Sequence, residues 1–303
     1  MEEKRFKIIS DSCCDLPRSY CEENEIGIVP LYVAFQDGEY KRDFFDFTYH
    51  EFYQRMMDHP GDFPKTSLPG VEDYMKIFRP FAEAGREVLC LCMTTTMSGS
   101  YNSAKVAVDE LLDDYPDARI RVVDTKALTV FQGQLVREAV RMRNLGKGLE
   151  ETAEIIERIK GDGAAFFTIG DLSYLNKGGR IGGLVKLAAV SLGLKPVILF
   201  QEGNISLGTI TRSRKKSLTE LARQAAAFLK KKAQDLDGYY LQVGYGLSLE
   251  DGEEVRKAFR EALEANGFRN VPEPELVQIG TMVGAHNGPM LMGIAFLKKH
   301  QFA

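Results

Sequence analysis

The chain has 303 residues, of which 44% are hydrophobic and 27% are charged, and its formal net charge is −4. These proportions are typical of a soluble globular protein that is long enough for two domains and buries its core without disulfides or metal ions. The negative net charge argues against a nucleic-acid-binding surface. The five cysteines form no C-x-x-C pair, and the chain starts without an apolar signal segment, so the cytoplasm is the expected location.

The first half of the chain alternates short apolar runs with segments of helical periodicity. Strands are expected at residues 6–9, 28–35, 87–93 and 119–124, and helices near residues 15–23, 48–57, 69–78, 104–112, 132–144 and 149–160. This alternation predicts a mostly parallel sheet covered by helices. Ligands of such sheets bind beyond the carboxyl ends of the strands, where Asp11, Thr94–Ser98 and Asp124 fall.

Hydroxyl side chains and a glycine fill the turn between the strand at 87–93 and the helix that follows. Ser98, Gly99 and Ser100 occupy this turn. The first N–H groups of a helix have no partner within the helix and carry partial positive charge, so the turn is suited to hold a carboxylate or phosphate. The alternative is that Ser98 or Ser100 is only an N-cap. Thr66 and Ser67 form a second hydroxyl-bearing loop before a helix that Pro69 opens.

The second half begins after a flexible Gly-Asp-Gly joint at residues 161–163, which predicts two domains, residues 1–161 and 162–303. Expected strands lie at 164–169, 195–200, 205–211, 239–245, 275–279 and 293–297, and expected helices at 171–180, 184–192, 217–234 and 248–266. The hairpin turn at 202–204 pairs its flanking strands antiparallel. This pattern predicts an α+β domain with a mixed or antiparallel sheet. The apolar stretch at 184–200 contains Lys186, Lys195 and Pro196, so no membrane span is expected.

Two glycine-rich segments of the second half carry basic groups. His286 is expected in a loop between Gly284 and Gly288, where glycine backbone allows a ligand close approach or merely forms a tight hairpin. Lys177 and Arg180 flank two glycines at the end of a short helix, where they face a phosphate or a partner protein, or are surface charges beside a helix cap.

Catalytic motifs are weak in this sequence. Ser98, His286 and Asp124 supply the groups of a hydrolase triad, but the segment around Ser98 is not G-x-S-x-G. The chain has no P-loop, no G-x-G-x-x-G and no H-E-x-x-H, so nucleotide cofactors and metal ions are not expected.

Five segments in order, spread over residues 6 to 297, together resemble the DegV family of fatty-acid-binding proteins, which includes the binding subunits of bacterial fatty acid kinase. They are Ser10-Asp11-Ser12 with Asp15-Leu16-Pro17, Thr66-Ser67-Leu68-Pro69, Ser98-Gly99-Ser100-Tyr101-Asn102-Ser103-Ala104, Asp171-Leu172 with Lys177-Gly178-Gly179-Arg180-Ile181, and Gly284-Ala285-His286-Asn287-Gly288-Pro289. The chain departs from the family pattern at Leu68, Gly70, Ser100, Gly182 and Met290.

The resemblance implies one long-chain fatty acid in a tunnel between two domains. Thr66 and Ser98 would then bind the carboxylate, with Ser67, Gly99 and His286 in the same polar cluster. A separate fatty acid kinase would phosphorylate the carboxyl group. Arg180, together with Lys177, would lie near the mouth where this kinase docks. The protein itself would supply no chemistry and no cofactor, and its only approach to a membrane would be transient.

Apolar residues of the second half are candidates for the tunnel wall, although each is equally suited to the core. They are Phe166, Phe167, Leu187, Val190, Leu194, Met282 and Met292. The main hypothesis is a fatty-acid carrier for a kinase. The alternatives are a Ser98-dependent lipid esterase or acyl hydrolase and a regulatory protein that senses lipid.

Overall fold

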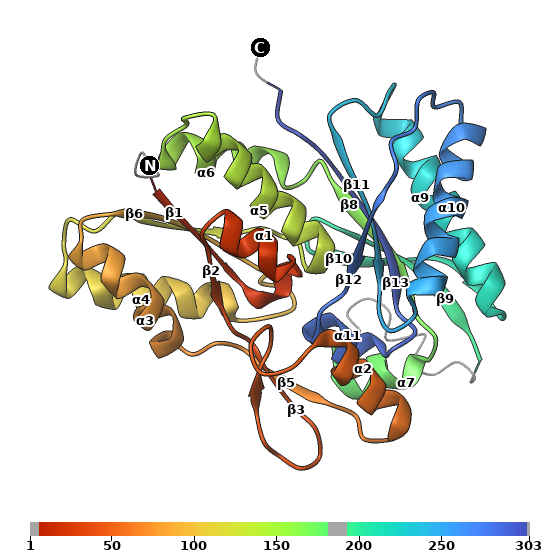
Figure 1. Cartoon of the computed structure of the whole chain (residues 1–303), viewed down its shortest axis with the longest axis horizontal. Coiled ribbons are helices and arrows are strands. Elements are labelled where there is room, and N and C mark those ends of the chain that lie inside the picture. Colours follow the sequence, from red (N-terminus) through yellow and green to blue (C-terminus); the bar gives the residue numbers. More distant parts are fainter. Residues whose placement is uncertain (1–5, 181–192, 302–303) are drawn as a thin grey trace.

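The computed structural model describes residues 6–180 and 193–301 and arranges them around three sheets (Figure 1). The helix expected at 184–192 and the candidate wall residues Leu187 and Val190 lie outside the described residues.

The first sheet is parallel throughout, with strand order β2-β1-β6-β7, as predicted. Its strands are β1 (Phe6–Asp11), β2 (Ile26–Val29), β6 (Glu87–Cys92) and β7 (Ile120–Asp124). Helices α3 (Val71–Glu83) and α4 (Ser100–Asp114) pack on one face. The other face is covered by α5 (Thr129–Asn144) and α6 (Leu149–Ile159), with the short η1 (Ser12–Cys14) and α1 (Arg18–Glu23) beside them.

A small antiparallel sheet, β4-β3-β5, lies below the first sheet (Figure 1). It contains β3 (Tyr32–Ala34), β4 (Lys41–Arg42) and β5 (Lys65–Ser67), and α2 (Tyr49–Asp58) follows β4 along the chain. The single strand expected at 28–35 is therefore wrong. Pro30 lacks a backbone N–H, and it separates β2 and β3, which belong to different sheets. Thr66 and Ser67 lie on β5 rather than in the expected loop.

The third sheet is mixed, with strand order β10-β9-β8-β13-β11-β12, and confirms the predicted α+β second half. Its strands are β8 (Ala164–Thr168), β9 (Lys195–Gln201), β10 (Asn204–Thr211), β11 (Tyr239–Tyr245), β12 (Glu275–Gln278) and β13 (Met292–Lys298). Only the β11–β12 pair is parallel among the described strands of this sheet. Helices α9 (Arg214–Lys232) and α10 (Leu249–Ala265) cover its outer face.

Two short helices, α7 (Leu172–Gly178) and α11 (Thr281–Asn287), pack together beside α2. The glycine-rich loop expected around His286 is wrong, because residues 281–287 are helical. A Cβ at Gly284 would overlap the ring and hydroxyl of Tyr53 on α2. Gly284 is therefore required for close packing between helices, and not for loop flexibility.

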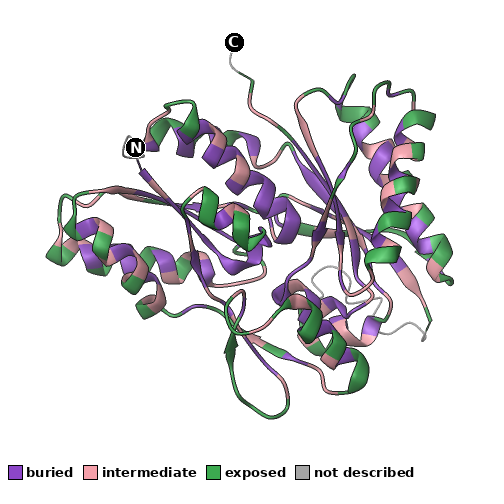
Figure 2. Cartoon of the chain, in the orientation of Figure 1, coloured by how far each residue is buried: buried purple, intermediate pink, exposed green. Residues whose placement is uncertain are grey.

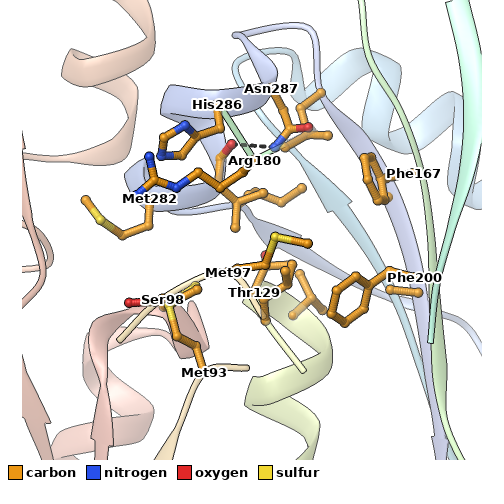
Figure 3. A pocket seen from close by; sticks show the side chains of 18 of the residues that line it. Met93, Met97, Ser98, Thr129, Phe167, Arg180, Phe200, Met282, His286 and Asn287 are labelled. Carbon is orange, nitrogen blue, oxygen red and sulfur yellow. Dashed lines mark hydrogen bonds between the residues drawn. The ribbon is translucent and has the colours of Figure 1, made fainter. Parts of the chain in front are cut away.

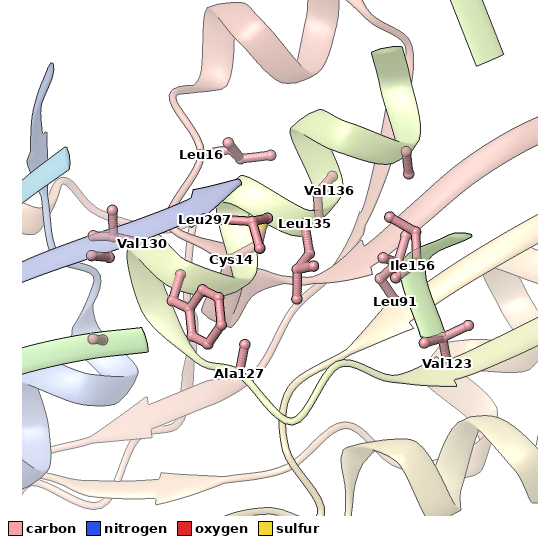
Figure 4. Close-up of a cluster of buried hydrophobic side chains, with 14 of the residues drawn as sticks. Cys14, Leu16, Leu91, Val123, Ala127, Val130, Leu135, Val136, Ile156 and Leu297 are labelled. Carbon is pink, nitrogen blue, oxygen red and sulfur yellow. The ribbon is translucent and has the colours of Figure 1, made fainter. Parts of the chain in front are cut away.

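Helix α5 lies between the parallel and the mixed sheet (Figure 1) and is buried almost all round, as Figure 2 shows. A helix that is buried on nearly every side is typical of a position between two layers. One continuous cluster of apolar side chains therefore reaches from Leu91 and Val123 of the first sheet, through Val130 and Leu135 of α5, to Leu297 of the mixed sheet (Figure 4). Within residues 6–180 and 193–301, no helix is both long enough and apolar enough to cross a membrane.

Candidate functional site

A cavity of about 490 Å³ opens where α11, the start of α4 and the inner face of the mixed sheet meet. This volume is within the usual range for a small-molecule site, about 300–1,000 Å³. Figure 3 shows Ser98, Arg180 and His286 on one side of the cavity and Phe167 and Phe200 on the other. The cavity therefore has a polar end and an apolar end.

The turn that carries Ser98 is fixed by a buried carboxylate. Asp11 Oδ2, at the end of β1, accepts hydrogen bonds from the Met93 N–H and the Ser100 hydroxyl, both at 2.8 Å. Burial raises the pKa of Asp11, and these hydrogen bonds oppose that increase. Ser98 Oγ accepts a hydrogen bond from the Ser100 N–H at 3.2 Å. The N-cap of α4 is Gly99, and not Ser98 or Ser100.

His286 lies opposite this turn and pairs with Thr66. The His286 Nε2 and Thr66 Oγ1 atoms are 2.8 Å apart, so α11 and β5 meet at the polar end. Burial, and secondarily the positive charge of Arg180, lower the pKa of His286 to about 4. The imidazole is therefore neutral at physiological pH.

The two glycines after Lys177 have separate structural roles. A Cβ at Gly178 would overlap the imidazole of His286, so glycine lets α7 pack against that ring. Gly179 has a φ of +67°, and this left-handed conformation ends α7. The chain then turns Arg180 into the cavity lining, and its guanidinium donates a hydrogen bond to the Gly178 carbonyl at 3.0 Å.

The structure brings most of the predicted polar residues into one cavity. Thr66, Ser67, Ser98, Gly99, Arg180 and His286 all line it. Lys177 is exposed on α7 and is not among the described lining residues.

The predicted hydrolase triad is not assembled in the described part of the chain. The Asp124 carboxylate accepts hydrogen bonds from the Thr95 hydroxyl at 2.8 Å and the Lys126 N–H at 2.9 Å. Asp124 therefore makes no hydrogen bond to His286, whose Nε2 atom pairs with Thr66.

The predicted wall residues divide into two groups. Phe167 and Met282 line the cavity, and Phe166 borders it although its ring packs with Phe228 and Phe296 on the outer face of the sheet. Met292 and Leu194 do not appear among the described lining residues. Met292 belongs to the core between the mixed sheet and helices α9 and α10. The next residue, Gly293, lies on the opposite face and lines the cavity, because successive residues of a strand face opposite sides of the sheet.

Two buried acids that sequence reasoning did not place at this site hold the start of α11. Asp43 Oδ1 accepts a hydrogen bond from the Thr281 hydroxyl at 2.8 Å, and the Asp15 carboxylate accepts one from the Gly280 N–H. Burial raises the pKa of Asp43 to about 6 and that of Asp15 well above its usual value. Asp15 is part of the D-L-P motif, but the sequence around Asp43 carries no comparable signal.

A metal centre is not apparent in the parts of the chain that the structure places. No group of three or more His, Cys, Asp or Glu side chains among them is arranged to hold an ion.

Comparison with known proteins gives one consistent result. Residues 5–299 match the family model described as "Uncharacterised protein, DegV family". A DegV domain-containing protein of Clostridium perfringens is 29% identical over 97% of this chain and 98% of its own. A solved stearic acid-binding protein from Eubacterium ventriosum is 41% identical, with a TM-score of 0.90 over 97% of this chain and 98% of that one. A DegV family protein from Thermus thermophilus, solved for its fatty acid binding, is 28% identical with a TM-score of 0.83, over 97% and 99% of the two chains.

Proposed function

The chain belongs to the DegV family, and from that premise we propose that it binds one long-chain fatty acid in the cavity between its parallel and mixed sheets. The observation that carries this proposal is the polarity of the cavity, with Ser98, Arg180 and His286 facing one side and Phe167 and Phe200 the other. The stearic acid-binding protein from Eubacterium ventriosum, with the same fold and 41% identity, supports it.

The polar end is suited to a carboxylate. In the tautomer that carries its proton on Nε2, His286 donates to the Thr66 hydroxyl, which then donates its own hydrogen to the ligand carboxylate, and Ser98 donates from the other side. Ser67 and Gly99 complete the lining at the ends of β5 and of the turn before α4. Hydrogen bonds to an ionised acceptor are stronger than those between neutral groups, so a few donors compensate for burial of the carboxylate.

The apolar end supplies most of the binding free energy. Each buried methylene contributes about 0.8 kcal/mol, so a chain of about fourteen gives roughly 11 kcal/mol before the cost of association and chain ordering. The carboxylate contacts mainly fix the orientation of the ligand, with its head at the Thr66–His286 pair.

We further propose that the protein presents the carboxylate to a separate fatty acid kinase and supplies no catalytic group. Arg180 is exposed yet lines the polar end, and Lys177 is exposed one turn earlier. Arg180 at the polar end and Lys177 on the adjoining surface are suited to the phosphate groups that such a kinase brings. Mixing the loaded protein with a fatty acid kinase and ATP should produce acyl phosphate, and Lys177→Ala, outside the described cavity lining, should lower the rate with little change in lipid affinity.

The carboxylate site is tested by substituting Thr66 and Ser98 with alanine together. The double variant should bind a fluorescent fatty acid at least tenfold more weakly and keep its thermal unfolding temperature within a few degrees. Ser206→Ala and Thr209→Ala on the exposed strand β10 serve as the control pair. Equal affinities of the two double variants would refute the assignment of the site.

A lipid hydrolase is the second candidate, because Ser98 and His286 line the same cavity. A fluorophosphonate probe distinguishes the two functions. We expect no covalent label on Ser98, since no acid is hydrogen-bonded to His286 among the described residues. Labelling of Ser98 would favour the hydrolase.

A further inference from the structure

On the inner face of the mixed sheet, glycine and alanine residues lie next to Phe167 and leave space there. Phe167, Gly293 and Gly244 lie directly opposite one another on β8, β13 and β11. In the next row Ala165 lies opposite Ala295. Since directly paired residues, and residues two apart on a strand, share a face of the sheet, all five face the cavity that they line.

The outer face of the same strands is filled by large side chains. Phe166, Ile294 and Phe296 pack there under helices α9 and α10. From Met292 to Phe296 of β13, large side chains on the outer face alternate with Gly293 and Ala295 on the inner face. The cavity therefore exists because side-chain volume is missing from this part of the inner face.

Gly244 and Gly293 differ in whether there is free space beside them for a side chain. A Cβ at Gly244 would lie 2.9 Å from Ile279 side-chain carbons and 3.0 Å from a Val130 methyl, so that space is already filled. A Cβ at Gly293 would meet the Phe166 carbonyl oxygen at 3.4 Å and Ile279 Cδ1 at 3.9 Å, which are ordinary contact distances. A methyl group therefore fits at Gly293 and occupies cavity space.

We propose that Gly293 sets the length of the acyl chain that the cavity accepts, an inference that rests on the proposed fatty-acid binding. Gly293 is paired with Phe167, which lies on the side of the cavity away from Ser98 and His286 (Figure 3). With its head at the polar end, a long chain brings its last methylenes to Gly293, whereas a short chain ends before it. A side chain at residue 293 should therefore lower the affinity for long chains and leave the affinity for short chains unchanged.

The test measures dissociation constants for saturated acids of 10 to 20 carbons with the full-length protein and its Gly293→Ala and Gly293→Val variants. One buried methylene contributes about 0.8 kcal/mol, or roughly fourfold in affinity. Gly293→Ala should lower the affinity ratio of the longest bound chain to the shortest by about fourfold. Gly293→Val should lower it by more than tenfold, with the shortest chains unaffected. If Gly293→Val does not fold, the alanine variant decides, because its methyl makes only contacts of ordinary length.

Met292→Leu is the matched control. It alters the adjacent residue of β13, whose side chain is buried on the outer face, with little change of volume. Its ratio of long-chain to short-chain affinity should equal that of the unsubstituted protein. Equal weakening of all chain lengths by Gly293→Ala, or no change in the ratio, would overturn the role of Gly293 while leaving fatty-acid binding intact. Failure of the unsubstituted protein to bind any of these acids would instead refute the proposed function, and this inference with it.

Discussion

At the scale of single residues, the polar end of the cavity depends on a histidine that stays neutral. Burial, more than the charge of Arg180, lowers the pKa of His286 to about 4 from its usual value of 6.5. The folded state therefore binds fewer protons at His286 than the unfolded state between those two values. The stability that this group contributes is present above pH 6.5 and is lost as the pH falls toward 4.

This linkage predicts the pH dependence of a His286→Gln variant. Between pH 7.5 and pH 5, the free energy of unfolding of the unsubstituted protein should fall by about 2 kcal/mol more than that of the variant. Urea unfolding of both proteins at the two pH values measures the difference. Parallel losses of stability would show that His286 is not held neutral in the folded state.

The acids at the start of α11 give a second residue-scale prediction. Asp43→Ala removes the acceptor of the Thr281 hydroxyl and leaves that buried donor unpaired, which should cost about 1–3 kcal/mol of stability. Because α11 carries His286, fatty-acid affinity should fall as well. Asp46→Ala is the control, since it removes only interactions with the partly exposed Arg42, an ion pair and a hydrogen bond from the Arg42 backbone N–H, and should cost about 1 kcal/mol. Equal unfolding free energies for the two variants would argue against this anchoring role.

At the scale of elements, helix α11 shows where sequence reasoning reaches its limit. Strands β1, β6 and β7 of the parallel sheet and the capping box of α2, formed by Thr48 and Glu51, follow from local patterns. The glycines around His286 favoured a loop, because the sequence alone does not reveal that Tyr53 packs where a side chain of residue 284 would lie. The same holds for Thr66, whose strand is defined by its pairing with Val33 of β3.

The packing of α11 on α2 is tested by Gly284→Ala. Alanine favours helix by about 1 kcal/mol over glycine, but the overlap with Tyr53 should reverse the sign and destabilise the protein by about 1–3 kcal/mol. Gly148→Ala is the comparison, because no atom lies within 4 Å of its added Cβ. Stabilisation by Gly284→Ala, measured by thermal or urea unfolding, would contradict the close packing.

At the scale of the whole molecule, the two halves share α5 and one continuous buried cluster. The order of strands, helices and turns predicted the two sheet types, whereas the tunnel between the domains was implied by the resemblance to the DegV family. The boundary between residues 161 and 162 stays a prediction, as do the roles of Thr66, Ser98 and His286 in ligand binding. Local patterns did not indicate that α5 packs against both sheets, because its burial on all sides depends on tertiary contacts.

The shared core predicts cooperative unfolding. Calorimetry of the lipid-free protein should show a single transition. A fatty acid at a hundred times its dissociation constant should stabilise the protein by about 2.7 kcal/mol and raise the transition temperature. Two separate transitions, with only one moved by the ligand, would contradict a site that both halves build.

The most direct test of fatty-acid binding is mass spectrometry of the purified protein, in native form and after solvent extraction. The proposed function predicts one long-chain fatty acid per chain in the native spectrum, and the same acid in the extract. A protein that carries no lipid, and that also fails to take up added acids of 14 to 18 carbons, would contradict it. The cavity between Ser98 and Phe167 would then have to bind a ligand of another class.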